Sequence, residues 1–234
     1  AQLRKMSGFF KRFFSGREVP GVRLIVFDFD GTLVDTKELL LRIVSGHLAR
    51  FNISMTKNLI ISFGNAPLKD YISAAGMKRD FVRSVSESIN GDFIAEHKKV
   101  RSCADLQTVE KIPIRKVIVS NNNTYFIEKT LGYLHSNFFD NIYGADKFKN
   151  KVYAIKKLCR RYHISPGEVV YVADKVIDVR IARDVGCYSV IVSNKSSWST
   201  HAEVSKEKPD YIIRSLGNLP LVIESINIKQ LSIV

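Results

Sequence analysis

Three polar clusters follow directly on three short apolar runs of this sequence. The first is Asp-Phe-Asp-Gly-Thr at residues 28–32, the second is Ser-Asn-Asn at residues 120–122, and the third pairs Asp174 with Asp178 one helical turn later. Carboxylates crowded in a cleft resist ionising together unless a cation offsets their charge. Oxygen ligands of this kind suit Mg²⁺. An Asp carboxylate can also attack a phosphoryl group and form an aspartyl-phosphate.

The second cluster supplies groups that could hold a phosphate. The hydroxyl of Ser120 and the backbone N–H groups of Ser120 and Asn121 are donors for phosphate oxygens, and a lysine ammonium would add a point charge. Each polar residue also has a purely structural interpretation. The first cluster could be a turn with capping carboxylates, Ser120 could be a helix N-cap, and Asp178 could face solvent on a helix.

The apolar runs in front of the clusters are short and rich in β-branched residues, which is typical of buried parallel strands. Strands are expected at 23–27, 116–120, 141–143, 169–172, 188–192 and 211–213, and helices at 124–131, 151–162, 176–185 and 219–226. This alternation predicts an α/β fold, a Rossmann-like parallel sheet with helices on both faces. Parallel strands point the same way, so the three clusters should meet at the carboxyl edge, where open α/β sheets bind ligands.

An insertion separates the first cluster from the rest of the alternation. Between residues 36 and 111 apolar residues recur at helical spacing, for example at Leu40 and Ile43, and no strand is expected. We therefore predict a helical cap domain over 36–111, inserted after the first strand. The core domain would then comprise 21–35 and 112–234.

The clusters resemble the motifs of the haloacid dehalogenase superfamily of phosphohydrolases. Residues 28–35 resemble the first motif, and Ser120 resembles the second. A lysine at the start of the helix that precedes Asp174 resembles the third motif, and residues 172–178 resemble the fourth. Order and spacing match from Val22 onward. The helical insertion resembles the cap of the phosphoglycolate phosphatase-like branch. The family usually has glycine where this chain has Ala173, a change that a negative φ tolerates.

The resemblance implies a role for each acidic residue. Asp28 would be the nucleophile, and Asp30 the general acid that protonates the leaving group and later activates water as a base. Asp28, the backbone carbonyl of Asp30 and Asp174 would hold Mg²⁺. Asp178 would support the metal directly or through its waters.

The resemblance also implies phosphate-binding residues, namely Ser120, Asn121 and a lysine. The proline that usually follows this lysine is missing, so Lys147, Lys149 and Lys151 all compete for this role. Lys151 begins the predicted helix at a suitable distance before Asp174 and is preferred, while Lys149, which could equally be a solvated surface charge, is the alternative.

The cap would close over the site, exclude water and select the substrate. Its candidate loop spans residues 63–67, with Gly64 and Asn65 as the residues expected to reach the substrate. Trp198 and the serines around it are expected in a surface loop.

Composition limits the remaining possibilities. Hydrophobic residues make up 45% of the 234 residues, which is ordinary for a globular protein with a buried core. Three dispersed cysteines predict reduced, mostly buried thiols, and the absence of a signal peptide or spanning segment predicts a cytoplasmic protein. The net charge of +13 favours anionic partners, but no nucleic-acid-binding motif is present and none is expected as a partner. A basic-aromatic segment at residues 1–20 could touch a membrane surface weakly through residues 3–17.

The expected function is therefore that of a Mg²⁺-dependent phosphatase acting on a small phosphorylated metabolite, a phosphomonoester, through an aspartyl-phosphate. A sugar phosphomutase with the same core is the nearest alternative, and it would need a bisphosphate activator. A non-catalytic regulatory or anion-binding protein is the other, although no catalytic aspartate is missing. The sequence predicts neither the natural substrate nor the oligomeric state.

Overall fold

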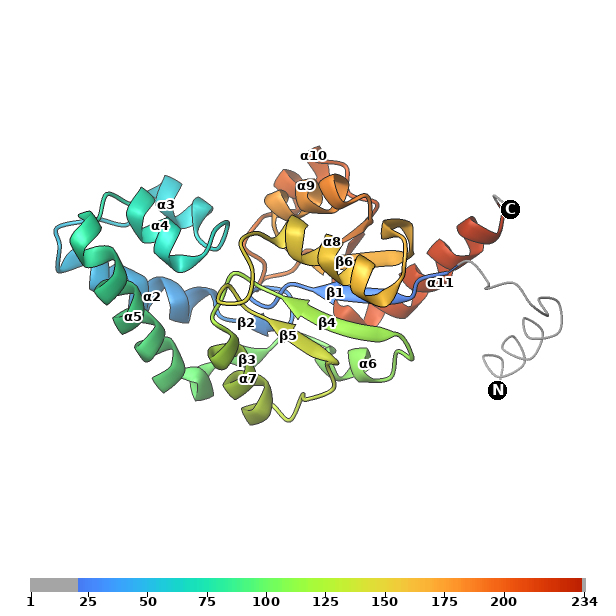
Figure 1. The fold of residues 1–234 in the computed structure, drawn as a ribbon, viewed down its shortest axis with the longest axis horizontal. Coiled ribbons are helices and arrows are strands. Elements are labelled where there is room, and N and C mark those ends of the chain that lie inside the picture. Colours follow the sequence, from blue (N-terminus) through green and yellow to red (C-terminus); the bar gives the residue numbers. More distant parts are fainter. Residues whose placement is uncertain (1–20, 233–234) are drawn as a thin grey trace.

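A six-stranded parallel sheet forms the centre of the structure, a computed structural model that describes residues 21–232 (Figure 1). The strands lie in the order β5-β4-β1-β6-β7-β8. Their bounds are β1 Leu24–Phe27, β4 Arg115–Val119, β5 Asn141–Tyr143, β6 Val169–Ala173, β7 Tyr188–Val192 and β8 Tyr211–Ile213. All neighbouring pairs are parallel. The predicted Rossmann-like sheet is therefore confirmed.

The strand order reverses beside β1. The chain builds outward from β1 to β4 and β5, then returns to the other side of β1 with β6 and continues to β7 and β8. In open α/β sheets the crevice at such a reversal is the usual ligand site. Asp28 follows β1 and Asp174 follows β6, so the fold places these two carboxylates side by side at the reversal.

Helices cover both faces of the sheet because alternate strand residues point to opposite faces. In β1, Leu24 and Val26 pack with the helices α8, α9 and α10, whereas Ile25 and Phe27 pack with α6, α7 and α11. The bounds are α6 Leu106–Glu110, α7 Thr124–Tyr133, α8 Lys151–Tyr162, α9 Val176–Val185, α10 His201–Lys206 and α11 Leu219–Leu231.

The first turn of α8 is fixed by the residue in front of it. The side chain of Asn150 accepts a hydrogen bond from the backbone N–H of Tyr153 at 2.8 Å, as an N-cap residue does. Apolar residues of α8 then bury against the sheet through Ala154, Ile155 and Leu158. Together these constraints place Lys151 at the start of the helix with its side chain buried.

Four helices of the insertion, which we call the cap, lie beside the core (Figure 1). They are α2 Lys37–Ala49, α3 Lys57–Ser62, α4 Leu68–Ala74 and α5 Arg79–Ala95. The chain enters and leaves them through a short antiparallel pair, β2 Val34–Asp35 and β3 Arg101–Ser102. Strand β3 was not expected, because a two-residue strand carries no readable periodicity. The cap-domain bounds 36–111 stay a prediction, since α6 packs against the core segment η3 Leu216–Asn218.

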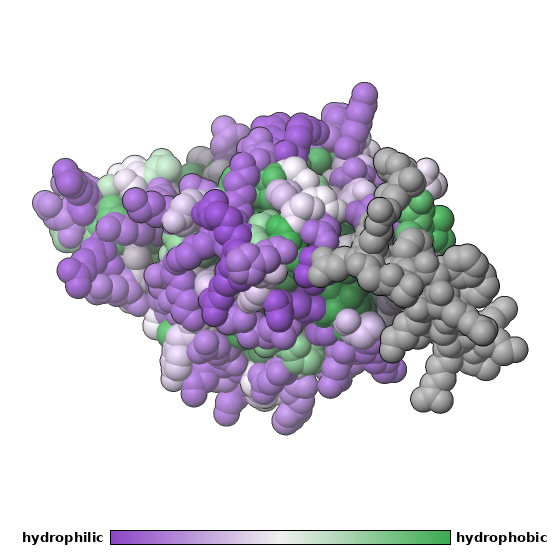
Figure 2. All heavy atoms as spheres, turned by 45° about the vertical axis from the view of Figure 1, so that its right-hand side comes forward, coloured by the Kyte–Doolittle hydropathy of each residue, from purple (hydrophilic) through white to green (hydrophobic). Residues whose placement is uncertain are grey.

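The structure also shows the cysteines, the surface and the hydrophobicity of the helices. Cys103, Cys159 and Cys187 are free and buried, as predicted. Figure 2 shows one face of the molecule, on which hydrophilic residues prevail. Within residues 21–232, no helix has both the length and the hydrophobicity needed to cross a bilayer. The expected membrane-surface segment, residues 3–17, lies outside the described residues.

Candidate active site

The carboxylate of Asp28 is held at the end of β1. Its backbone N–H donates to the carbonyl of Val172 at 2.8 Å, which extends the pairing of β1 with β6 by one residue. One carboxylate oxygen accepts from the backbone N–H of Phe29 at 2.7 Å, and the other accepts from the ammonium of Lys151 at 2.7 Å. Asp28 is only 5% exposed and borders a cavity. A buried, oriented carboxylate of this kind is suited to nucleophilic attack.

Three carboxylates gather at the reversal of strand order. Oxygen atoms of Asp28, Asp174 and Asp178 all lie within 4.8 Å of one another, and all three residues are buried. Burial, and next the charges of Asp178 and Asp28, raise the pKa of Asp174 well above its ordinary value. Concentrated negative charge without enough compensation is relieved by a cation. The donor set, made only of carboxylate oxygens, fits Mg²⁺.

Lys151 offsets part of this charge. Its ammonium donates to Asp28 at 2.7 Å, to Asp178 at 3.2 Å and to the hydroxyl of Tyr171 at 3.0 Å. Burial acts to lower the pKa of Lys151, but the carboxylates of Asp178 and Asp28 outweigh it and raise the pKa above its ordinary value. Lys151 therefore remains an ammonium in the site. Lys147 and Lys149 are exposed, and of the three candidate lysines Lys151 is the one that reaches Asp28.

Asp30 has different surroundings from the three clustered carboxylates. Its oxygens accept hydrogen bonds from the hydroxyl of Thr36 at 2.7 Å and from the side-chain amide of Asn122 at 3.1 and 3.2 Å. Burial, and next the charge of Asp28, raise the pKa of Asp30 to about 6. A carboxyl group with this pKa can carry a proton near neutral pH, as a general acid must.

Ser120 and Asn121 lie between the core and the cap. Ser120 is buried and its hydroxyl accepts from the backbone N–H of Asn122 at 3.2 Å. The N-cap of α7 is Asn123, which accepts from the backbone N–H of Tyr125 at 2.9 Å, so Ser120 is not the helix cap. The side-chain amide of Asn121 donates to the carbonyl of Gly64 in the cap at 3.1 Å.

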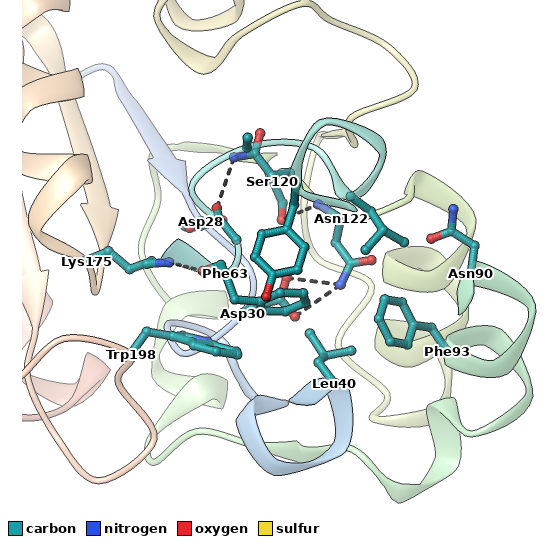
Figure 3. Close-up of a pocket in the computed structure, with 15 residues that line it drawn as sticks. Asp28, Asp30, Leu40, Phe63, Asn90, Phe93, Ser120, Asn122, Lys175 and Trp198 are labelled. Carbon is teal, nitrogen blue, oxygen red and sulfur yellow. Dashed lines mark hydrogen bonds between the residues drawn. The ribbon is translucent and has the colours of Figure 1, made fainter. Parts of the chain in front are cut away.

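A small cavity lies between these residues and the cap (Figure 3). Its volume is about 40 Å³, enough for a few water molecules at about 10–15 Å³ each. Gly64 lines it, whereas Asn65 is exposed and is not among the lining residues. The lining residues from the cap are Leu40, Phe63, Gly64, Ala66, Leu68, Tyr71, Asn90 and Phe93.

Residues 25–192 match the family of haloacid dehalogenase-like hydrolases, which is well over half of the chain. The chain belongs to this family. It is similar to the phosphoglycolate phosphatase of Vibrio cholerae, with 24% identity over 228 residues that cover 85% of this chain and 95% of the relative. It is also similar to the phosphoglycolate phosphatase of Synechococcus elongatus, with 26% identity over 212 residues that cover 85% and 95%.

A structural comparison supports the same assignment at the level of the fold. A crystal structure described as a predicted phosphatase from Clostridium acetobutylicum superposes with a TM-score of 0.75 at 19% identity, covering 88% of this chain and 100% of that one. This hydrolase therefore has the fold of that family with a helical cap, and it is similar in sequence to phosphoglycolate phosphatases.

Two site residues of this hydrolase were not anticipated. Lys175 is 5% exposed and lines the cavity. Trp198 was expected in a surface loop, but it is half-buried and also lines the cavity. Its backbone N–H donates to Asp174 at 2.5 Å. Lys175 could have been suspected from its place next to Asp174, whereas nothing in the sequence links Trp198 to a site 24 residues earlier.

Gly31 lets the first cluster approach the third. It has a φ of +77°, and a Cβ atom there would lie 2.4 Å from a carboxylate oxygen of Asp174 and 2.6 Å from a ring atom of Trp198. A glycine is required here by both the backbone conformation and the space. The turn therefore depends on the absence of a side chain.

Gly31→Ala is expected to lower the free energy of unfolding by about 2–4 kcal/mol. The positive φ costs about 1 kcal/mol or more for a non-glycine residue, and the overlap costs about 1–3 kcal/mol. Urea unfolding followed by circular dichroism measures the change. The control is Gly46→Ala in α2, where an added Cβ meets nothing within 4 Å, and where alanine should stabilise the helix by about 0.5–1 kcal/mol. Equal stability of Gly31→Ala and the parent would contradict the close approach of Gly31 to Asp174 and Trp198.

Proposed function

We propose that this hydrolase is a Mg²⁺-dependent phosphatase that cleaves a small phosphomonoester through an aspartyl-phosphate on Asp28. The observation that carries the proposal is the setting of Asp28, whose carboxylate is buried, bound by Lys151 and bordered by Ser120 in one cavity. A phosphoryl group placed in this cavity would meet the carboxylate of Asp28 and the hydroxyl of Ser120, with the ammonium of Lys151 bonded to the same carboxylate. Proximity of this kind removes much of the entropic cost of reaction.

The carboxylates of Asp28, Asp174 and Asp178 would hold Mg²⁺, with the backbone carbonyl of Asp30 as the further ligand that the family resemblance implies. When bound, the ion offsets negative charge on the carboxylates and phosphoryl oxygens, so that one anion can approach another. The raised pKa of Asp174 is consistent with a site that lacks sufficient positive charge without the ion.

The protein groups divide the reaction into two displacements. In the first, a carboxylate oxygen of Asp28 forms a bond to phosphorus while the bond from phosphorus to the leaving-group oxygen breaks, and Asp30 gives that oxygen its proton. In the second, Asp30 takes a proton from water, the water oxygen bonds to phosphorus, and the bond to Asp28 breaks to release phosphate. Lys151 and Ser120 would bind the phosphoryl oxygens in both steps.

The cap limits the substrate to a small molecule. The cavity of about 40 Å³ between cap and core leaves little free room for a substrate, so the cap would have to move for entry and then close on the leaving group. The names of the relatives make phosphoglycolate a reasonable first substrate to screen. A phosphomutase would use the same residues but would require a bisphosphate activator for turnover.

Removal of metal is the direct test of this proposal. Hydrolysis of p-nitrophenyl phosphate is expected to fall by about 10²-fold or more in EDTA, because charge compensation by a metal contributes several kcal/mol to such transition states. Initial rates at 405 nm give the measurement, and excess Mg²⁺ added back should restore the rate. Undiminished hydrolysis in EDTA would exclude the metal-dependent mechanism.

A further inference from the structure

One turn of the cap, Phe63–Gly64, makes several contacts with the core (Figure 3). The ammonium of Lys175 donates to the carbonyl of Phe63. The side-chain amide of Asn121 donates to the carbonyl of Gly64 at 3.1 Å. The ring of Phe63 packs on the ring of Trp198 with 5.3 Å between centroids. The turn is therefore one place where the cap is held against the core beside the cavity.

The core side of this junction is bonded to two of the clustered carboxylates. The backbone N–H of Lys175 donates to Asp178 at 3.2 Å, and the backbone N–H of Trp198 donates to Asp174 at 2.5 Å. Two short routes thus connect the acidic cluster to Phe63, one through Lys175 and one through Trp198. One residue therefore lies between each of these carboxylates and the cap turn.

The side chain of Lys175 is buried at this junction. Its hydrogen-bond acceptor at the turn is a neutral carbonyl, and the ammonium lies 5.4 Å from the centre of the Trp198 ring. Hydrogen bonds to charged groups in a dry environment are stronger than those between neutral groups. Opening of the cap would break this bond and the ring contact together.

We propose that Lys175 is a positioning residue that holds the Phe63–Gly64 turn closed over the site and links cap closure to the acidic cluster. We call the contact of Lys175 with the Phe63–Gly64 turn the latch. The latch does not depend on the reaction chemistry, and only its effect on turnover rests on the proposed function. Because coupling between two sites is reciprocal, binding of Mg²⁺ at the acidic cluster should favour closure of the cap as much as closure of the cap favours binding of Mg²⁺.

The chain contains a built-in reporter of this junction. Trp198 is its only tryptophan, so the quenching of tryptophan fluorescence by acrylamide measures how far solvent reaches the face that Phe63 covers. Loss of a charge-assisted hydrogen bond should raise the ratio of open to closed cap by about tenfold to a hundredfold. The experiment compares the parent with Lys175→Met, Lys175→Arg and Lys37→Met, with and without Mg²⁺.

Lys37→Met is the matched control. The ammonium of Lys37 lies 5.7 Å from the centre of the same ring and donates to the carbonyl of Ser197 at 3.3 Å, away from the cap turn. Its loss removes a neighbouring cation from Trp198 without removing the bond to Phe63. We expect a higher quenching constant for Lys175→Met, recovery toward the parent for Lys175→Arg, and parental quenching for Lys37→Met.

Kinetics give a second readout on the same variants. With p-nitrophenyl phosphate, Lys175→Met should lower kcat while changing KM little, and Lys175→Arg should restore kcat. Parental quenching in Lys175→Met overturns the proposal. A rise in KM confined to substrates with an anionic leaving group, again with parental quenching, overturns it in favour of direct substrate binding by Lys175.

Two features keep the test decisive. Quenching needs neither metal nor turnover, so a protein without Mg²⁺-dependent hydrolysis would refute the proposed function and still report on the latch. Circular dichroism shows whether Lys175→Met folds. If it does not, Asn121→Ala takes its place, because it removes the other hydrogen bond to the turn and should raise the quenching constant. Lys175→Arg should then still show the parental quenching of a closed cap. Failure of both outcomes refutes the latch.

Discussion

Asp28→Asn is expected to lose about 10⁴-fold or more of the rate of p-nitrophenyl phosphate hydrolysis, which is the scale seen when a hydrolase loses its nucleophile. An amide does not form the aspartyl-phosphate, and it also removes the negative charge that Lys151 binds. Initial rates with Mg²⁺ measure the loss. Intact-protein mass spectrometry after acid quench should show a phosphorylated parent and an unmodified variant.

The variant should remain folded, which separates a catalytic defect from a structural one. Burial raises the pKa of Asp28, so the folded state disfavours its charged form, and that form costs stability as pH rises through this pKa. An uncharged amide carries no such cost, and Lys151 keeps Asp178 and Tyr171 as partners. The matched control is Asp80→Asn on the exposed start of α5, which should retain parental activity. Comparable activity of Asp28→Asn and the parent would refute Asp28 as nucleophile.

Asp30→Asn is expected to lower kcat by about 10²- to 10⁴-fold, the usual contribution of a general acid and base. Asp30 acts in both displacements, as an acid in the first and as a base in the second. The effect of the substitution on the rate should therefore depend on the leaving group. An aryl phosphate has a leaving oxygen that needs little protonation, so Asp28 should still be phosphorylated. The second displacement lacks its base and should become slow.

Rapid mixing distinguishes these two steps. With p-nitrophenyl phosphate, the variant should show a burst of p-nitrophenolate close to one equivalent, followed by slow turnover. With an alkyl phosphate the burst should be absent, because the first displacement then needs the acid. The control Thr36→Val removes only the hydroxyl that donates to Asp30, so kcat should fall less in this variant than in Asp30→Asn. Equal losses on both substrates without a burst would contradict a dual role for Asp30.

Much of the core could be predicted because its signals are local. Strand β1 and helices α8 and α9 follow from short apolar runs and helical periodicity, and α8 begins at Lys151 where the sequence predicted. Parallel strands share a direction, which was sufficient to bring the three polar clusters to one edge. The meeting of Asp28 with Asp174 needed no knowledge of side-chain packing.

Other features depended on contacts between distant parts of the chain. The sequence did not reveal that the side chains of Thr36 and Asn122 donate hydrogen bonds to Asp30. It assigned Gly64 and Asn65 to the substrate loop, and the structure shows that the carbonyls of Phe63 and Gly64 make the contacts with the core. Every residue has a backbone carbonyl, so the residue type at a position does not predict such a contact.

Sequence patterns were enough to establish the α/β core, the acidic residues at its carboxyl edge and the order of the motifs, because periodicity and strand direction act over a few residues. The folded chain was needed to show which lysine reaches Asp28, which side chains bind Asp30, and how Lys175 and Trp198 join the site to the cap. These depend on the packing of side chains from segments far apart in the chain, and no short pattern encodes that packing.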